Sequence, residues 1–350
     1  MKRHRASKER KRLSGNEDVV RMAHGGGGKL THALIESIFL PAFRNKILER
    51  MEDSAVLPRR GRRIAFTTDS YTVKPLFFPG GDLGKLAING TINDLAMQGG
   101  VIKPSMSCAF IIEEGLSFDL LRKIVESMKC AAEEADTQVV AGDTKVVERG
   151  AADQIYVSTS GVALVPRGLQ VGAEHVCVGD AVLISGPVGD HGATVLASRF
   201  DLKMREDFKS DCASLREMVL DLTLRKIEVH CMRDPTRGGL ATTLNEIASK
   251  RGVRIEVDET SIPVRPEVSA LCEILGLDPL YLACEGRMVC FTPWESRNEA
   301  LESMKSLSTG SGAALIGRVT GEGQRVVAKT AIGSHRILSM YLGEDQPRIC

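Results

Sequence analysis

Apolar runs of strand length alternate with amphipathic helical stretches along almost the whole chain, and this alternation limits the folds open to it. The span 63–68 predicts a strand and the span 83–98 a helix. A second pair follows, with a strand at 104–112 and a helix at 118–135 that Ser117 would cap. The turns between these elements lack the glycine fingerprint of a Rossmann fold. The pattern therefore predicts layers of mixed α and β elements without a dinucleotide-binding fold.

The 350 residues are 43% hydrophobic, which is enough for two domains with their own cores. We expect two α+β domains of similar size, at 22–172 and 173–340, with the break near residue 172 and a tail at 341–350. Further helices are expected at 30–48, 189–199, 213–229, 241–250, 266–275 and 295–306, and further strands at 138–143, 155–165, 180–186, 253–257, 281–284, 287–292 and 313–319.

Charge is concentrated at the N-terminus. Residues 1–12 hold seven Lys or Arg and one acid, which gives them a net charge of +6. Because the whole chain has a net charge of +1, the rest of the chain carries about −5. The body is therefore not a nucleic-acid binder by charge. Residues 1–21 are interpreted as a disordered basic extension, and a weak contact with nucleic acid or anionic lipid is the alternative. No apolar stretch in the sequence has the length of a secretory signal or a membrane span.

Nine cysteines are present, and none belongs to a CxxC pair. Many lie in apolar runs, which indicates buried thiols in a reducing cytoplasm, without a disulfide framework or a zinc site.

Cys350 is different because it is the last residue. The run before it, 343–349, contains Gly and Pro and has no apolar period, so we expect it to be mobile. A mobile thiol can be loaded in one place and processed in another. The adjacent α-carboxylate should raise the pKa of the thiol, and Arg348 should partly offset that effect. A frayed end with no role is the alternative.

Two glycine-containing segments are candidates for binding a polyanion. The four glycines 25–28 allow backbone amides to approach phosphate closely, with charge from Lys29 and a possible contact from His24. The alternative is a flexible joint. In 234–239, a proline, two glycine amides and Arg237 predict a phosphate-binding helix N-terminus. The alternative there is an ordinary capped helix.

Acidic residues at strand ends and loop–helix junctions predict a Mg²⁺–nucleotide site, because Mg²⁺ binds carboxylates together with phosphate oxygens. The candidate ligands are Asp69, Asp94 and Asp234, with Asp143 in reserve. Isolated aspartates at such positions are more often caps or turn residues, which is the alternative for each of them.

Lys145 and Glu285 are the acid–base candidates. Lys145 follows a predicted strand end, and Glu285 lies between two apolar strands, where an unpaired carboxylate is unfavourable. A salt-bridged surface residue is the alternative for both. His191, in a Gly-Asp-His-Gly sequence, is interpreted as a turn residue, with a ligand or a base as the alternative.

Taken together, these motifs make the chain resemble the HypE family, hydrogenase maturation proteins of the wider aminoimidazole-ribonucleotide-synthetase-like group of ATP enzymes. The resemblance covers 22–350, and the terminal Pro-Arg-Ile-Cys is its most specific part. Gly26 stands where members often carry Ser, and residues 1–21 extend beyond the usual start. The matching segments are 22–28, 68–71, 75–81, 93–94, 142–147, 149–153, 189–194, 233–239 and 347–350.

The resemblance implies a reaction and roles for residues. A carbamoyl group on Cys350, a thiocarboxamide, would be dehydrated to thiocyanate with ATP and Mg²⁺, supplying cyanide for the iron of [NiFe]-hydrogenase. Lys145 and Glu285 would handle the proton, and Asp69, Asp94 and Asp234 would bind the metal. The implied ATP-site residues are His24, Gly25, Gly26, Gly27, Gly28, Lys29, Thr68, Asp69, Asp94, Asp143, Thr144, Thr236 and Arg237.

The same resemblance implies partners and assembly. A HypF-type carbamoyltransferase would load the thiol, and HypC- and HypD-type iron-carrying proteins would take the cyanide. The N-terminal α/β domain would pair across a homodimer into a β-barrel, with ATP near the interface. Two other classes stay open: a selenophosphate-synthetase-like enzyme acting on a small molecule, and a non-enzymatic carrier that only presents Cys350.

Overall fold

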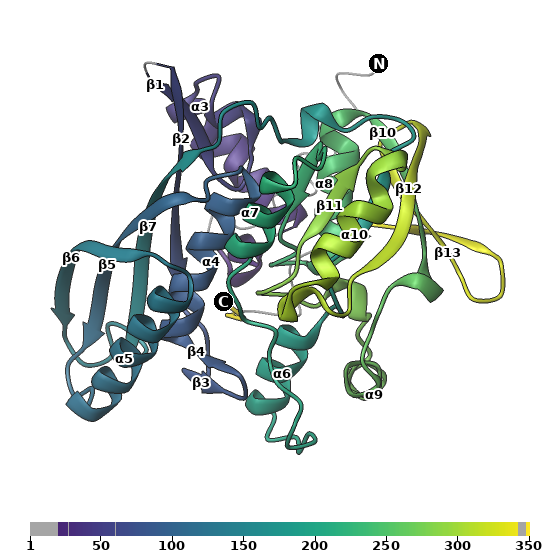
Figure 1. The fold of residues 1–350 in the computed structure, drawn as a ribbon. Coiled ribbons are helices and arrows are strands. Elements are labelled where there is room, and N and C mark those ends of the chain that lie inside the picture. The colour runs from purple at the N-terminus through teal and green to yellow at the C-terminus, as the bar shows by residue number, and fades with distance from the viewer. Residues whose placement is uncertain (1–19, 27, 60, 342–347) are drawn as a thin grey trace, which may run out of the picture.

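The computed structural model describes residues 20–26, 28–59, 61–341 and 348–350. Figure 1 shows two units, each built on its own sheet, with the C-terminal end of the chain between them. Residues 1–19 of the predicted extension, Gly27 of the glycine segment and residues 342–347 of the predicted mobile run lie outside the described residues. Within the described part, no helix combines the length and apolar character that crossing a membrane requires.

The first unit is a five-stranded sheet with the order β1-β2-β7-β5-β6. All its neighbours are antiparallel except β5 and β6, which are parallel. Two helices pack with this sheet, and a two-stranded hairpin precedes the first of them. The bounds are β1 (Ala55–Arg59), β2 (Arg62–Tyr71), β3 (Phe77–Phe78), β4 (Gly81–Asp82), α4 (Leu83–Met97), β5 (Ile102–Glu113), α5 (Phe118–Glu134), β6 (Gln138–Val147) and β7 (Ile155–Val165).

The second unit is a seven-stranded sheet with the order β14-β13-β10-β12-β8-β11-β9. Its elements also include the helices α6 to α10. The bounds are β8 (Ala181–Ile184), α6 (Asp190–Arg199), α7 (Arg216–Leu224), β9 (Cys231–Arg233), α8 (Gly239–Arg251), β10 (Val253–Asp258), α9 (Pro266–Leu275), β11 (Val289–Thr292), α10 (Arg297–Lys305), β12 (Ala314–Glu322), β13 (Arg325–Lys329) and β14 (His335–Leu338).

Both faces of the second sheet are covered, which explains why β8 is buried at all four positions. Val182 and Ile184 belong to a core cluster with residues of α8, whereas Leu183 belongs to a separate cluster with residues of α7 and α10. Alternate side chains of a strand point to opposite faces, so a strand between two helical layers is apolar throughout.

Helix α4 connects the two units. Asp82 caps it by accepting hydrogen bonds from the amides of Gly84 and Lys85. The helix packs on β2 and β7 of its own sheet and also contacts α7 and β9 of the second unit. Its Asn93 side chain donates to the carbonyls of Ala213 and Glu285. This buried amide therefore fixes a loop of the second unit against the first.

The predicted two-domain α+β class is confirmed, and several elements match closely. The helices at 83–98, 118–135 and 266–275 and the strand at 155–165 are found as α4, α5, α9 and β7. Ser117 caps α5 as expected. The break near residue 172 falls between β7 and β8, and as a domain boundary it stays a prediction. The strands β1, β3, β4, β9, β13 and β14 were not predicted.

Three expectations were wrong. The helix at 30–48 ends early, at Phe43; α2 (Lys29–Leu34), the π-helix η2 (Ile35–Phe39) and α3 (Leu40–Phe43) follow one another without a break. The strand at 281–284 does not form: Tyr281 ends a 3-10 turn, Pro279–Tyr281, that Asp278 caps, and residues 282–284 belong to no helix or strand. The strand at 138–143 continues to Val147, so Lys145 lies inside β6 rather than beyond a strand end.

Candidate functional site

Three aspartates from separate parts of the chain converge beside α4. Asp53 precedes β1, Asp94 lies on α4, and Asp234 follows β9. One carboxylate oxygen of each lies within 4.8 Å of those of the other two. Thr67 on β2 donates a hydrogen bond of 2.9 Å to Asp94 Oδ2 and so fixes its orientation. The sequence predicted Asp94 and Asp234 for this site but missed Asp53.

The environment of these carboxylates suits a divalent cation. Burial raises the pKa of Asp94 well above its usual range, and the neighbouring Asp69 and Asp234 raise it further. Burial likewise raises the pKa of Asp53, and that of Asp234 to about 6. The buried Oδ2 atoms of Asp53 and Asp234 have no hydrogen-bond partner among the described residues. Asp53 Oδ1 forms an ion pair of 3.1 Å with Arg233 Nε, which leaves Asp53 Oδ2 for a ligand. Mg²⁺ binds carboxylate oxygens, so the three residues fit the ion.

Asp69 lies next to this group, on β2. Its carboxylate accepts a hydrogen bond of 3.3 Å from the Thr91 hydroxyl. Burial raises its pKa, while the charge of Arg237 lowers it. The predicted ligand Asp69 is therefore adjacent to the three clustered aspartates without being one of them, and its role as a metal ligand stays a prediction.

Glu285 is close to the same charges. Its residue is 3% exposed, and its buried Oε1 has no partner among the described residues. Burial is the main reason that its pKa is raised well above the usual range, and the charges of Asp234 and Asp211 add to the effect. A carboxyl group held in this state binds a proton readily, which suits general acid–base chemistry.

The C-terminal residues are docked inside the molecule. The amide of Thr72, just past β2, donates to the Cys350 backbone oxygen at 3.2 Å, and the amide of Lys74 donates to the Arg348 carbonyl at 3.3 Å. Arg348 also forms an ion pair of 2.6 Å with Asp153. The last residues of the chain and the segment after β2 are thus joined by two backbone hydrogen bonds, which are spaced two residues apart in each segment. This spacing is typical of a peptide that adds a strand to the edge of a sheet.

Docking changes the chemistry of the Cys350 thiol. Burial raises its pKa to about 12, and the charge of Arg237 acts in the opposite direction. Glu285 and Asp69 raise it further. We expected Arg348 to lower the pKa of the thiol, but this effect comes mainly from Arg237, because Arg348 is paired with Asp153. The thiol is therefore close enough to the buried carboxylates of Glu285, Asp69 and Asp234 for their charges to act on it.

The glycine segment and the 234–239 segment meet at Arg237, whose Nη1 donates to the Gly25 carbonyl at 3.1 Å. Gly28 has a φ of +83°, and a Cβ there would lie 2.2 Å from the Tyr341 carbonyl oxygen. Glycine is therefore required at this position by close chain packing. The next amide, that of Lys29, donates to the same carbonyl.

Other predicted contacts have partners of their own. His24 Nδ1 accepts from the Arg21 amide, and the Thr68 hydroxyl donates to the Thr159 carbonyl. Thr236 belongs to the turn before α8, where its carbonyl accepts from the Gly239 amide. That amide is therefore not free, and α8 begins at Gly239 with Gly238 as its cap rather than at Pro235. As ATP contacts, these residues stay predictions.

The candidate residues on β6 lie apart from the cluster of buried aspartates. Asp143, Thr144 and Lys145 are exposed, and Lys145 Nζ forms an ion pair of 3.4 Å with Asp143. The amide of Thr144 donates to Asp143 Oδ1. Within the described part of the chain, no hydrogen bond or ion pair joins Lys145 to Glu285. A single copy of the chain thus does not bring the two predicted proton-handling residues together.

His191 was wrongly interpreted as a turn residue. It is the second residue of α6, and its side chain is fully buried. Its Nε2 forms a hydrogen bond of 2.9 Å with the carbonyl of Ile349.

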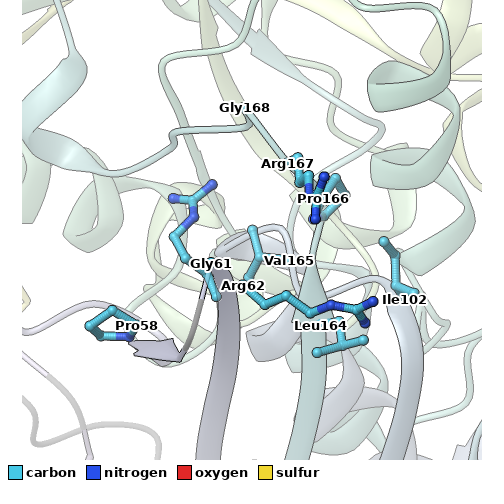
Figure 2. A pocket seen from close by; sticks show the side chains of 10 residues that line it. Pro58, Gly61, Arg62, Ile102, Leu164, Val165, Pro166, Arg167 and Gly168 are labelled. Atoms are coloured by element: carbon cyan, nitrogen blue, oxygen red, sulfur yellow. The ribbon is translucent and has the colours of Figure 1, made fainter.

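A separate pocket of about 640 Å³ lies at the far end of β2. Figure 2 shows Arg62, Ile102 and Arg167 among the side chains that line it. None of the predicted site residues contributes to this pocket, so it is not part of the candidate site.

Comparison with known proteins identifies the class first. A family model described as the N-terminal domain of AIR synthase related proteins matches residues 51–165, and the model of the C-terminal domain matches residues 178–329. Together they cover the first sheet and every strand of the second sheet except β14.

More specific relatives match almost the whole chain. It is 48% identical over 338 residues to a Rhodobacter capsulatus protein named carbamoyl dehydratase HypE, covering 95% of this chain and 99% of that one. A solved structure of a HypE–HypF complex matches with a TM-score of 0.82 and 45% identity, covering 90% of this chain and 100% of that one. A HypE solved with ATP has a TM-score of 0.80 and 46% identity, covering 95% and 100%. The chain belongs to the HypE family.

Proposed function

We propose that this protein uses ATP to dehydrate a carbamoyl group carried on Cys350, converting a thiocarboxamide into a thiocyanate for hydrogenase maturation. The observation that carries this proposal is the position of the docked thiol, which lies among the charges of Arg237, Glu285 and Asp69. The relatives named carbamoyl dehydratase and the relative solved with ATP support it.

The reaction balances in two steps. The carbamoyl oxygen attacks the γ-phosphorus of ATP, the bond to ADP breaks, and one N–H proton is lost. A base then removes the second N–H proton, the C–O bond breaks, and inorganic phosphate leaves with the former carbamoyl oxygen. The product is Cys350–S–C≡N. Phosphorylation is needed because an unmodified amide oxygen is a poor leaving group.

Side chains of this chain would divide the work. Asp53, Asp94 and Asp234 would hold Mg²⁺, which neutralises phosphate charge when it is bound. Arg237 would bind phosphate, since its guanidinium group lies beside the docked thiol. Glu285 is the base that the geometry favours, because its unpaired Oε1 lies in the same buried region. A carboxylate with a raised pKa is a stronger base once it is ionised.

Lys145 would join the site from a second copy of the chain. β6 is an edge strand, and its exposed residues include Val140 and Val146, at 65% and 68% exposure. Figure 1 shows this strand at the outer edge of the first sheet. A long edge strand with exposed apolar side chains is suited to pairing with another strand. We therefore propose a homodimer that pairs through this edge and places Lys145 near the partner's ATP.

The partners follow from the proposed chemistry. A HypF-type carbamoyltransferase would load Cys350, in line with the relative solved as a HypE–HypF complex. HypC- and HypD-type iron-carrying proteins would accept the cyanide. All nine cysteines are free, which fits a reducing compartment such as the cytoplasm.

Intact-mass measurement of the C-terminal peptide tests the proposal. The protein would first be loaded by a HypF-type partner with carbamoyl phosphate and the other substrates of that partner. Mg²⁺–ATP would then be added to one half of the loaded protein and withheld from the other half. A carbamoyl adduct on Cys350 that loses about 18 Da only after the second addition is the expected result. An adduct that never loses this mass would indicate a carrier, and ATP consumption without any adduct would indicate a small-molecule substrate.

A further inference from the structure

His191 is placed where it can control the docked tail. It lies at the start of α6, and its imidazole packs against the Phe78 ring in a T-shaped arrangement with 5.3 Å between ring centroids. Its Nε2 meets the Ile349 carbonyl at 2.9 Å, and its Nδ1 meets the Ser210 hydroxyl at 2.9 Å. Both ring nitrogens are therefore engaged, one by the protein body and one by the tail.

The hydrogen bonds define which nitrogen carries the proton. The Cys212 amide donates to Ser210 Oγ at 3.1 Å, so this hydroxyl is free to donate its own hydrogen to His191 Nδ1. The proton of the neutral ring must then be on Nε2, which donates to the Ile349 carbonyl. Burial lowers the pKa of His191, which favours this neutral form.

The backbone oxygens of the last three residues are each held by a hydrogen bond from the protein body. The oxygen of Arg348 accepts from the Lys74 amide and from Arg199, and that of Cys350 accepts from the Thr72 amide. The oxygen between them, that of Ile349, is held by His191. The Ile349 side chain is 3% exposed and belongs to the main core cluster.

We propose that His191 is a positioning residue that latches the terminal segment in the docked state, with Ser210 setting its tautomer. The Ile349 carbonyl is bonded directly to the Cys350 nitrogen, so the latch fixes the peptide plane from which the thiol side chain extends. Its contribution to dehydration rests on the proposed function, whereas the latch itself does not.

Alkylation of Cys350 in the full-length protein, without ATP or partner, tests the latch. His191→Leu keeps the volume but removes the donor, and we expect Cys350 to react about tenfold faster with iodoacetamide. His191→Gln retains a donor and should stay near wild type. Cys231 on β9 and Cys290 on β11 are buried in the second sheet, and their protection in the same digest separates tail release from unfolding. His230→Gln is the matched control, since His230 binds Asp180 and Glu228 rather than the tail.

An unchanged Cys350 rate in His191→Leu would overturn the latch, and so would equal increases in the Leu and Gln variants. If His191→Leu does not fold, Ser210→Ala provides the same test, because it removes the hydroxyl that selects the tautomer. A faster Cys350 reaction in that variant supports the latch, and an unchanged rate overturns it. If the loaded wild-type protein does not lose water in the ATP experiment, the proposed function is refuted, whereas the alkylation results for the His191 and Ser210 variants keep their meaning for the latch.

Discussion

Glu285 and Lys145, the two residues expected to handle the proton, lie in opposite environments. Glu285 is buried between the two units, and the backbone of its loop is tied to α4 through Asn93. Lys145 is exposed on the edge strand β6, with Asp143 as its ion-pair partner. One chain therefore completes the buried part of the proposed site, with the carboxylates and Cys350, while the proposed contribution from β6 faces outward. The difference teaches that the buried part can be tested in single chains and the outer part only in assemblies.

The largest effect should come from the thiol of the buried part. Cys350→Ala removes the only atom that can accept the carbamoyl group in the proposed reaction, so adduct formation should fall to zero. ATP binding should stay largely intact, because the aspartates and Arg237 are unchanged. Mass spectrometry and a nucleotide-binding assay check the two statements. A Cys350→Ala protein that still accepts the carbamoyl group would end the assignment.

Asp94→Asn should have the next largest effect. The amide cannot replace the anionic oxygen that Asp94 places near the carboxylates of Asp53 and Asp234, so Mg²⁺–ATP should bind more weakly. Water loss in a single turnover should slow by about 10³-fold. Asp119→Asn, on the exposed surface of α5, is the control. Wild-type turnover at the same Mg²⁺ concentration in Asp94→Asn would remove this cluster from the mechanism.

Glu285→Gln should accumulate the thiocarboxamide. The amide has a similar shape but cannot accept the proton, and loss of a general base slows such steps by about 10²–10⁴-fold. Intact-mass spectra taken over time would show the loaded form persisting in the presence of ATP. Glu273→Gln on exposed α9 is the matched control. Nitrile formation at the normal rate in Glu285→Gln would refute the base assignment.

Mixed dimers of Lys145→Ala and Glu285→Gln chains test whether the outer part acts across the interface. If Lys145 serves the partner's site, each mixed dimer contains one intact site, so an equal mixture should recover about a quarter of wild-type activity. If Lys145 serves its own chain, no site is intact and activity stays at the level of the separate variants. Affinity capture through a tag carried by only one of the two variants, followed by mass analysis of the captured chains, confirms that exchange has occurred.

Much of the buried part was predictable from local sequence, because aspartates beside glycines and strand ends were visible as motifs. Asp53 was missed since it precedes a short strand that was itself not predicted; its only signal was two consecutive acids, Glu52 and Asp53, before an apolar run. His191 was missed because its partners, Ser210 and Ile349, are distant in the sequence. A local pattern carries no information about which chain segment will dock beside it.

Lys145 shows the opposite error. Gly142 and Asp143 have low strand propensity, so the sequence suggested that the strand ended there. The structure continues β6 to Val147 because parallel pairing with β5 continues as far as Glu113. Pairing between strands overrides local propensity here, and the exposed outer side of the same strand would be defined only by a second copy.

The smallest expected effect is on stability. Asp234 has a pKa raised to about 6 by burial, above its value in the unfolded chain. The unfolded state therefore loses this proton first as pH rises, and without Mg²⁺ the group costs about 3 kcal/mol of stability between roughly pH 4 and pH 6. Urea unfolding with chelator should show wild type losing this stability relative to Asp234→Asn, and Mg²⁺ should restore it at pH 7. Equal pH dependence of the two proteins would contradict the buried charge.

The measurement that tests the central claim most directly follows the carbamoyl oxygen. Cys350 would be loaded by the HypF-type partner with a carbamoyl group that carries heavy oxygen at its carbonyl, and Mg²⁺–ATP would then be added. Transfer of the γ-phosphoryl group to that oxygen predicts that the label leaves in inorganic phosphate as the thiocyanate forms. Label found in water, with unlabelled phosphate, would contradict phosphorylation of the carbamoyl oxygen and with it the proposed reaction.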